Sequence, residues 1–334
     1  MMKERMTVSK KLLSRNLQRT EILIIGAGVI GSLYAAQMAK AGYSVTVFSR
    51  GERLEEITRS GIRIQHYKED KIETITKLKV TDELRPEDNY DYVFVALRYD
   101  NLASVYPLLN KSSVSNIIFM TNNPYGFDDY GRHLNKARVL CAFPGAGGEI
   151  ENGVVKYHIV SRVIQPTTIG DSLGVRTQRA KNIAGILRLS GFPVAINRDM
   201  NSWLLSHLAM VCPLGNIIYR DYEVSDNSTS LVLLSACLKE AFLFLRENGY
   251  SINPARFNLF VYTPQRLLRF LLKRLYRTDF AKTVIFNHAV NARQEMALLT
   301  EQFIKIAEIK KVRLPLNTEL SSFNIASKTG ETHE

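Results

Sequence analysis

The chain has 334 residues, of which 46% are hydrophobic and 23% charged, with 19 glycines and 10 prolines. This length corresponds to about two domains of roughly 150 residues each, and the composition excludes the collagen-like, low-complexity and disordered classes. Subtracting 32 acidic from 44 basic residues gives a net charge of +12, which suits a nucleic acid, a membrane surface or an anionic small molecule and does not decide among them.

Residues 1–20 carry six lysine or arginine residues and lack the apolar segment of a signal peptide, so we expect a basic N-terminal extension on a cytoplasmic protein. The most apolar stretches, residues 203–219 and 231–245, are interrupted by polar or charged side chains and fall short of the ~20 apolar residues that a bilayer span requires. Three cysteines without CxxC spacing predict reduced core residues. We therefore expect no membrane partner and no metal.

The first informative pattern is a βαβ unit over residues 21–50. The apolar run EILII predicts a parallel strand covered on both faces, GAGVIG follows it directly, SLYAAQMAKAG has helical periodicity, and SVTVFSR returns to strand character. Further strands are predicted at residues 61–65, 92–97, 116–121 and 138–143. This alternation of strands with helical stretches predicts an α/β fold with a Rossmann-type, doubly wound sheet.

After residue 143 the pattern changes. Glycines and β-branched residues over 144–170 predict antiparallel strands or a hairpin that finishes the sheet, followed by a helix at 176–189 and a last strand at 192–196. Asn253-Pro254 and Thr263-Pro264 each place a capping residue before a proline at the first helical position. Nearly all of the remaining chain is predicted helical, over residues 201–219, 230–248, 254–262, 264–277 and 280–310.

These patterns predict a domain boundary near residue 198. Residues 21–198 form the expected Rossmann domain, and residues 199–334 an all-helical domain for substrate binding and dimerisation, whose apolar helices are compatible with a homodimer. The densest basic run, residues 266–277, alternates with leucine and phenylalanine at helical spacing. This alternation favours a surface helix packed on a core over a nucleic-acid or lipid surface. We therefore expect no nucleic-acid partner.

The glycine turn points to a dinucleotide. Gly26, Gly28 and Gly31 match GxGxxG, in which the glycines permit a tight turn, close approach of the backbone to a pyrophosphate and close packing of helix on strand. The turn also contains Ala27, Val29 and Ile30. Because the motif lies between a strand and a helix, its context favours a cofactor site over a glycine-rich turn of another α/β fold.

The end of the second strand selects the cofactor. NAD enzymes usually place Asp or Glu there to bind the ribose 2′-hydroxyl, whereas this chain has Ser49 followed by Arg50, with Arg53 one helical turn on. No carboxylate repels a 2′-phosphate at this place, and a guanidinium can bind it through two charge-assisted hydrogen bonds. The sequence predicts NADP(H), with residues 21–198 as the NADP-binding domain. The alternative for Arg50 is a solvated charge at a strand end.

With these motifs the chain resembles the ketopantoate reductase family over most of residues 21–320. The segments GAGVIG, SRGERLEEI, GIRI, PGAGGEIENGVV and TIGD resemble the family's first half, and RQEMALLTEQFIKIAEIKKVRLPLN its closing helix and proline turn. The family has a lysine that faces the cofactor at a strand end, and in DYVFVALRYDNL Arg98 takes that place after Leu97. The family also has an asparagine that touches cofactor and substrate, and Asn123 of TNNPYG takes its place here. The alternative is that Asn123 is an ordinary turn asparagine.

The resemblance implies that NADPH reduces a 2-oxo acid in pantothenate synthesis, in a cleft between the domains. It weakens at the catalytic positions. The family's lysine, which protonates the developing alkoxide, is replaced in WLLSHLAMVCPLGN by His207, and the asparagine four residues later by Val211. KTVIFN stands in place of the serine stretch that binds substrate, whereas Glu295 matches the family's acidic residue in the closing helix.

Reduction of a ketone by hydride leaves negative charge on oxygen, so a positioned acid is needed. Histidine titrates closest to neutral pH, which makes His207 the candidate acid, and a core histidine bonded to a carbonyl is the alternative. Trp203, His207 and Met210 share one helical face. Glu295 would hold the imidazole tautomer or a substrate hydroxyl, with a plain surface or capping carboxylate as the alternative.

Two functions therefore remain open. The first is an NADPH-dependent oxidoreductase acting on a small 2-oxo acid, which need not be ketopantoate because several polar anchors are replaced. The second is a non-catalytic NADP(H)-binding sensor that keeps the cofactor residues and has lost catalytic ones. An opine-type or 6-phosphogluconate-type dehydrogenase is disfavoured by the middle strands and the TNNPYG loop. Without a GxSxG elbow or a Ser-His-Asp order, hydrolase chemistry is not supported.

Overall fold

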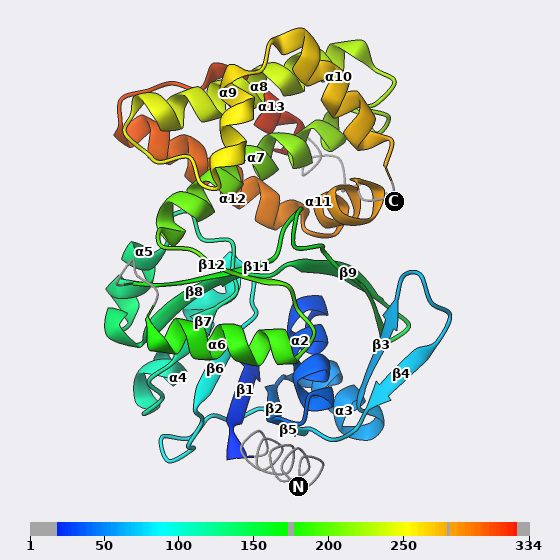
Figure 1. The fold of residues 1–334 in the computed structure, drawn as a ribbon, viewed down its shortest axis with the longest axis vertical. Helices are drawn as coiled ribbons and strands as arrows, with labels where there is room; N and C mark the ends of the chain where they lie inside the picture. The colour runs from blue at the N-terminus through cyan, green and yellow to red at the C-terminus, as the bar shows by residue number, and fades with distance from the viewer. Residues whose placement is uncertain (1–18, 173–176, 279–280, 326–334) are drawn as a thin grey trace, which may run out of the picture. The chain divides into compact units, whose positions relative to one another are not determined.

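The computed structural model describes residues 19–172, 177–278 and 281–325, which pack into two compact units. One unit runs to Thr121 and resumes over Phe127–Arg198, and the other combines Asn122–Gly126 with the chain from Asp199 onward (Figure 1). The boundary between the units thus falls between Arg198 and Asp199. The loop Asn122–Gly126 packs with the helical unit, although the surrounding chain belongs to the first.

The first unit is built on an eight-stranded sheet in the order β12-β11-β8-β7-β6-β1-β2-β5. Neighbouring strands run parallel except β8 and β11. Because β1 lies between β2 and β6, the strand order reverses at β1, and open α/β sheets bind ligands at such a switch point. The predicted Rossmann-type sheet is confirmed. The strands are β1 (Glu21–Ile25), β2 (Ser44–Phe48), β5 (Lys79–Thr81), β6 (Tyr92–Val95), β7 (Ile117–Phe119), β8 (Val139–Phe143), β11 (Thr167–Asp171) and β12 (Val194–Ile196).

Helices cover this sheet on both faces, as an apolar strand such as EILII requires. Residues 22–25 of β1 are each at most 1% exposed, which is typical of a strand buried from both sides. The helical elements of the unit are α2 (Val29–Lys40), α3 (Gly51–Ser60), η1 (Tyr99–Ser104), α4 (Tyr106–Lys111), α5 (Phe127–His133), η2 (Lys136–Arg138) and α6 (Gln178–Leu189).

A second, four-stranded sheet corrects two sequence predictions. Its order is β4 (Ile72–Ile75), β3 (Ile62–His66), β10 (Val154–Ile159) and β9 (Ala146–Glu151). The strand predicted at 61–65 therefore does not join the main sheet. The predicted hairpin, β9 and β10, does not finish that sheet either, because β10 pairs with β3. The predicted antiparallel strand is found in β11, which pairs with β8 in the main sheet.

The physical reason for the second sheet is helix α2. Seven of its twelve residues are buried, among them Leu33 and Tyr34. A helix that is apolar on nearly all sides must be covered on nearly all sides. The main sheet covers α2 through β1 and β2, and the second sheet covers it through β3, β9 and β10 (Figure 1).

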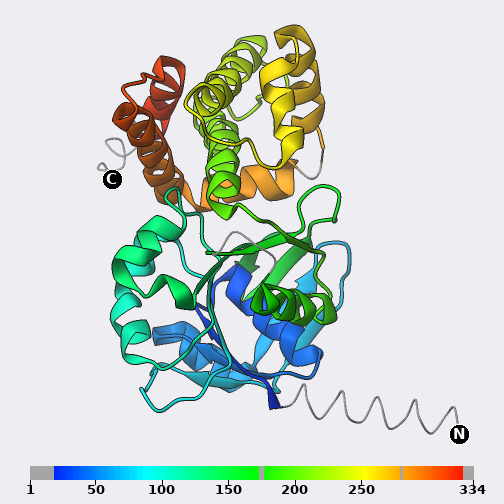
Figure 2. The same cartoon turned by 60° about the vertical axis from the view of Figure 1, so that its left-hand side comes forward.

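The second unit is helical and is organised around α7. Helices α8, α12 and α13 all pack on α7, and Figure 2 shows green α7 between the yellow helices and the orange to red ones. Both long helices begin at a capping side chain, since Asp199 accepts a hydrogen bond from Ser202 N, and Asn227 accepts one from Thr229 N. The elements are α7 (Met200–Arg220), α8 (Ser228–Glu247), η3 (Ala255–Asn258), α9 (Leu259–Tyr262), α10 (Gln265–Tyr276), η4 (Ala281–Phe286), α11 (Asn287–Asn291), α12 (Arg293–Ile309) and α13 (Pro315–Ile325).

The helix predicted over 280–310 is broken into η4, α11 and α12. At Ala292 the backbone leaves the helical region, with φ −125° and ψ 34°. The break costs little because the Tyr219 hydroxyl, on α7, donates a 2.6 Å hydrogen bond to the Ala289 carbonyl oxygen. Tertiary packing thus supplies a partner that a continuous helix would have supplied itself. The predicted proline turn after α12 likewise begins a further helix, α13, at Pro315.

Helices α7 and α8 are each long and apolar enough to cross a membrane, by length and composition alone. In their most apolar windows, 78% and 61% of the residues are buried inside the structure. Burial of this extent is also what core helices show, so the two helices carry no argument for a membrane span.

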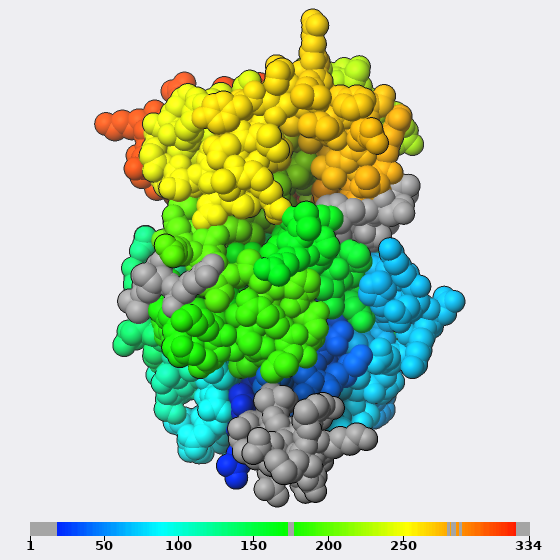
Figure 3. All heavy atoms as spheres, viewed as in Figure 1, coloured from blue at the N-terminus to red at the C-terminus, as the bar shows by residue number. Residues whose placement is uncertain are grey.

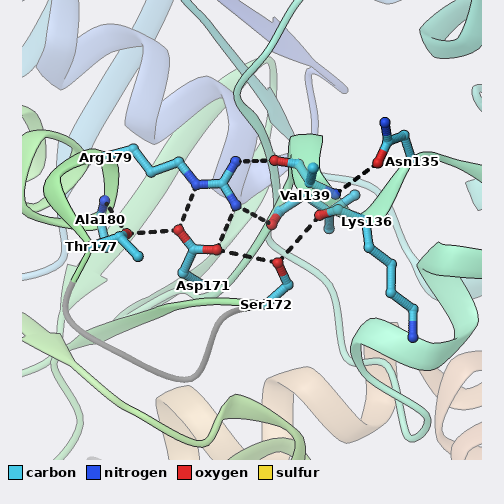
Figure 4. Close-up of polar contacts among 9 residues, drawn as sticks. Asn135, Lys136, Val139, Asp171, Ser172, Thr177, Arg179 and Ala180 are labelled. Atoms are coloured by element: carbon cyan, nitrogen blue, oxygen red, sulfur yellow. Dashed lines mark hydrogen bonds and ion pairs between the residues drawn. The ribbon is translucent and has the colours of Figure 1, made fainter.

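One largely buried ion pair ties helix α6 to strands β8 and β11 of the main sheet. Asp171, at the end of β11, has a fully buried side chain and accepts two hydrogen bonds from the Arg179 guanidinium and one of 2.7 Å from the Thr177 hydroxyl (Figure 4). Arg179 also donates to the carbonyl oxygens of Ala137 and Val139, which join α6 to the start of β8.

Asp171→Ala is expected to lower the free energy of unfolding by about 3–5 kcal/mol, because it leaves a largely buried guanidinium without its counter-charge. Urea unfolding measures this loss. Asp128→Ala is the matched control, because its ion pair with Lys136 is exposed on both sides and such pairs contribute at most about 1 kcal/mol. Equal losses in the two variants would contradict the structural role of Asp171.

Candidate functional site

The GAGVIG turn connects β1 to α2 with almost no spare space. Gly26 has φ +102°, a left-handed conformation that favours glycine, and a Cβ there would lie 2.6 Å from the Ala96 carbonyl oxygen. A Cβ on Gly31 would lie 1.8 Å from the Gly26 carbonyl oxygen. These two glycines therefore let the helix begin directly against the strand, as the sequence predicts.

Gly28 is different, because it faces open space. It is exposed, it is the N-cap of α2, and no heavy atom lies within 4 Å of the place where its Cβ would stand. The amides at the start of α2, including those of Val29 and Ile30, lack intrahelical acceptors, and the first turn has no acidic residue. Such a helix end attracts phosphate. The residues present thus fit the pyrophosphate of a dinucleotide.

Arg50 stands free at the end of β2. Ser49 is buried and its amide donates to the Thr81 carbonyl oxygen, whereas Arg50 is exposed and lies over the Phe48 ring, 5.2 Å from its centroid. A cation stacked on an aromatic face is held in place without losing its hydrogen-bond donors. The guanidinium therefore remains available to a phosphate.

Arg53, the second predicted cation, is already engaged. Its Nε donates to the Ala27 carbonyl oxygen at 3.2 Å, its Nη2 donates to the Ser32 hydroxyl at 3.1 Å, and its Nη1 pairs with the Glu56 carboxylate at 2.6 Å. Burial raises the pKa of Glu56, but hydrogen bonds and charge from Arg53 and Arg63 outweigh it and lower the pKa overall. Arg53 thus holds the glycine turn. Sequence reasoning missed Ser32 and Glu56, because only the fold brings them to it.

Leu97 and Arg98 follow β6, next to the glycine turn. The Leu97 side chain lies 2.8 Å from the place of a Gly26 Cβ, and its carbonyl oxygen accepts a hydrogen bond from the Thr121 hydroxyl. Arg98 is exposed at the N-cap of η1. The structure therefore brings these two predicted residues, together with the glycines and both arginines, to one edge of the Rossmann sheet.

Asn123 lies in the TNNPYG loop and is fully buried. Its Oδ1 accepts a 2.9 Å hydrogen bond from Tyr125 N, which closes an Asx turn. The Tyr125 hydroxyl donates to Gln302 Oε1 on α12 at 2.6 Å. The neighbouring Asn122 is 8% exposed, and its buried Oδ1 has no hydrogen-bond partner among the described residues. Asn122 is therefore a further candidate for a polar contact with a ligand. The sequence signal that could have found it is the Asn-Asn pair in TNNPYG.

His207 lies on α7 and is only 5% exposed. Its ring stacks on Trp203, with centroids 5.3 Å apart and planes within 5°. Met210, on the same predicted face, is half-buried. The stacking fixes the plane of the imidazole, which both a positioned acid and a core histidine require.

The structure does not bring Glu295 to His207. Glu295 is 6% exposed, in the first turn of α12. That turn packs on the C-terminal part of α7. The Arg293 guanidinium lies 4.6 Å from the Tyr219 ring centroid, and the Met296 side chain fills the space beside Gly215. Along the axis of α7, Gly215 lies about 12 Å and Tyr219 about 18 Å beyond His207. Holding the imidazole tautomer is therefore not a role that this geometry supports.

Comparison with known proteins agrees with this arrangement. Residues 22–172 match the family model for ketopantoate reductase PanE/ApbA. The 2-dehydropantoate 2-reductase of Pyrococcus abyssi is 22% identical over 306 residues, which cover 85% of this chain and 97% of the relative. The 2-dehydropantoate 2-reductase of Archaeoglobus fulgidus is 27% identical over 184 residues, 55% of this chain and 58% of the relative.

Solved structures share the fold. A PanE/ApbA family ketopantoate reductase from Ralstonia eutropha superimposes with a TM-score of 0.75 at 17% identity, covering 94% of this chain and 100% of that one. A D-mandelate dehydrogenase in complex with NADH and anilino(oxo)acetate gives a TM-score of 0.74 at 13% identity, covering 93% and 99%. The chain is thus similar to the ketopantoate reductases, by the family model over residues 22–172 and by relatives that cover most of its length.

Proposed function

We propose that this protein is an NADPH-dependent reductase that converts a small 2-oxo acid to the 2-hydroxy acid in the cytoplasm. The relatives' names support the substrate class, because dehydropantoate is a 2-oxo acid and mandelate a 2-hydroxy acid. The printed name 2-dehydropantoate 2-reductase fits pantothenate biosynthesis. In this proposal residues 21–198 bind the cofactor, and residues 199–334 contribute substrate contacts.

The observation that carries the cofactor proposal is Arg50. An exposed guanidinium follows β2 directly, the preceding Ser49 is neutral, and the glycine turn beside them is open at Gly28. A dinucleotide with its pyrophosphate on the start of α2 places its adenosine ribose near the end of β2. When bound, the nicotinamide supplies the hydride. The chain's own part is to bind the phosphates and orient the ring, to which Leu97, Arg98 and Asn123 would contribute.

Arg50→Ala is expected to weaken NADPH binding roughly 10- to 150-fold and leave NADH binding unchanged, because charge-assisted hydrogen bonds contribute about 1.5–3 kcal/mol. Calorimetric titration of both cofactors measures this. Arg59→Ala is the control. Arg59 is also exposed, but it lies in the last turn of α3, at the opposite end of that helix from its N-cap, Arg50. Equal affinity of the wild type for NADH and NADPH would show that the proposed preference is wrong.

Arg53→Ala is expected to behave differently, because Arg53 touches the glycine turn that both cofactors use. Its loss should weaken NADPH and NADH by similar factors, each about tenfold for one or two hydrogen bonds of about 1 kcal/mol. A selective loss of NADPH would instead place Arg53 on the 2′-phosphate.

We propose that His207 donates the proton to the developing alkoxide. Trp203 holds the imidazole plane, and burial keeps water away from it. Glu295 would then contact a substrate hydroxyl or serve packing alone. Turnover of NADPH over a panel of 2-oxo acids, including 2-dehydropantoate, tests the reductase, and binding of NADPH without turnover of any of them would favour a non-catalytic binding protein.

A further inference from the structure

Helix α10 exposes apolar side chains that the sequence pattern assigned to a core. Leu268 and Leu272 are buried in the core of the helical unit, and α10 packs on α8. Leu267, Phe270 and Leu271 are 49%, 55% and 47% exposed. Spacings of three and four residues place these three on one face of the helix. The helix therefore has one apolar stripe that packs and a second that faces outward.

The exposed stripe lies in a stretch of one charge sign. Residues 248–278 contain six arginine or lysine residues and no aspartate or glutamate. Among the described residues, no ion pair is recorded for Arg266, Arg269, Lys273 or Arg274. The preceding helix α9 adds exposed Leu259 and Tyr262. Figure 3 shows the yellow and gold atoms of this stretch gathered on one face of the helical unit.

We propose that this α9–α10 face docks on an anionic lipid bilayer surface. Leucine, phenylalanine and tyrosine beside arginine and lysine form the pattern of helices that lie in a membrane interface, with apolar side chains in the acyl boundary and cations at the headgroups. The absence of acidic residues over 248–278 removes the repulsion that anionic headgroups would otherwise meet. This proposal revises the expectation of no membrane partner.

Two other occupants fit less well. In a symmetric dimer formed through this face, the arginine and lysine side chains of one copy would lie against those of the other and repel them. A nucleic acid would use the cations but gain little from exposed leucines, whose transfer out of water favours an acyl environment. Of these occupants, an anionic lipid surface alone binds both the exposed apolar side chains and the cations of the α9–α10 face.

Flotation of the full-length protein with phosphatidylglycerol-phosphatidylcholine vesicles, compared with pure phosphatidylcholine vesicles, tests the proposal. We expect binding to the anionic vesicles only, weakened by salt. The double variant Arg266→Gln, Arg274→Gln should bind about 25-fold more weakly, at roughly fivefold per cation. Phe270→Ser with Leu271→Ser should weaken binding at least about tenfold.

Arg59→Gln with Lys77→Gln is the matched control, since both side chains are exposed on the first unit. It removes the same charge and should bind like the wild type. All of these residues are exposed, so thermal unfolding should be unchanged in every variant. Equal binding to neutral vesicles, no binding to anionic ones, or binding insensitive to the α10 variants would overturn the proposal. So would retention of RNA in place of vesicles, or a dimer dissociated by Phe270→Ser.

Discussion

Replacing Gly28 with alanine is expected to preserve the fold and to weaken binding of NADPH and NADH alike, by roughly five- to 150-fold. The new methyl group would enter open space in the free protein, so no contact is strained. In the complex it would occupy the place of the pyrophosphate, at a steric cost of about 1–3 kcal/mol. Thermal unfolding and calorimetric titration on the same sample separate the two effects.

Gly31→Ala is the control with the opposite outcome. Its methyl group would stand 1.8 Å from the Gly26 carbonyl oxygen, so the strand or the helix must move, and we expect a loss of about 3 kcal/mol or more in the free energy of unfolding. If Gly28→Ala also unfolded the protein, or if it bound both cofactors normally, the assignment of the open turn to the pyrophosphate would be wrong.

His207→Gln is expected to lower kcat by about 10²- to 10⁴-fold and to leave the Kd for NADPH unchanged. The amide keeps much of the volume and the hydrogen bonding of the imidazole but does not titrate, so the variant removes the proton donor and little else. Single-turnover oxidation of NADPH with the best 2-oxo acid of the panel measures the chemical step directly.

The matched control is His133→Gln, because His133 is exposed on α5 and stacks on Tyr106 within the first unit. It should turn over like the wild type. An unimpaired His207→Gln would assign His207 to packing against Trp203 and leave the acid to be found elsewhere. A variant with lowered thermal stability and proportionally lowered binding would point to the same structural role.

The Rossmann half of the fold was predictable, because its signals are local. EILII, the three glycines and the strand ending at Phe48 each specify their own conformation, and the structure places them as expected. The second sheet was not predictable, because β4 has only four residues, none of them buried, and pairs only with β3. Its existence follows from the need to cover α2, which is a tertiary requirement that appears in no single segment.

The same distinction separates the site residues. Arg50 was identifiable because its place is set by the strand directly before it. Arg53 is only three residues further along the chain, yet its guanidinium contacts Ala27 and Glu56, and this orientation is set by the packing of helix α3. Glu295 lies on α12 and His207 on α7, and these two helices pack on each other. The two residues nevertheless lie at different levels along the helices, several turns apart, and a sequence motif does not contain this information.

The coverage of α2 by two sheets bears on how the protein meets its cofactor. Tyr34 on this helix stacks on Phe192 at 3.9 Å and shares a 2.6 Å hydrogen bond with the Thr167 hydroxyl on β11, and burial raises the pKa of Tyr34 so that the phenol stays neutral. A helix clamped in this way is already rigid before any nucleotide arrives. Capture of the diphosphate then requires no ordering of the backbone that receives it, so this part of the entropic cost of binding is absent.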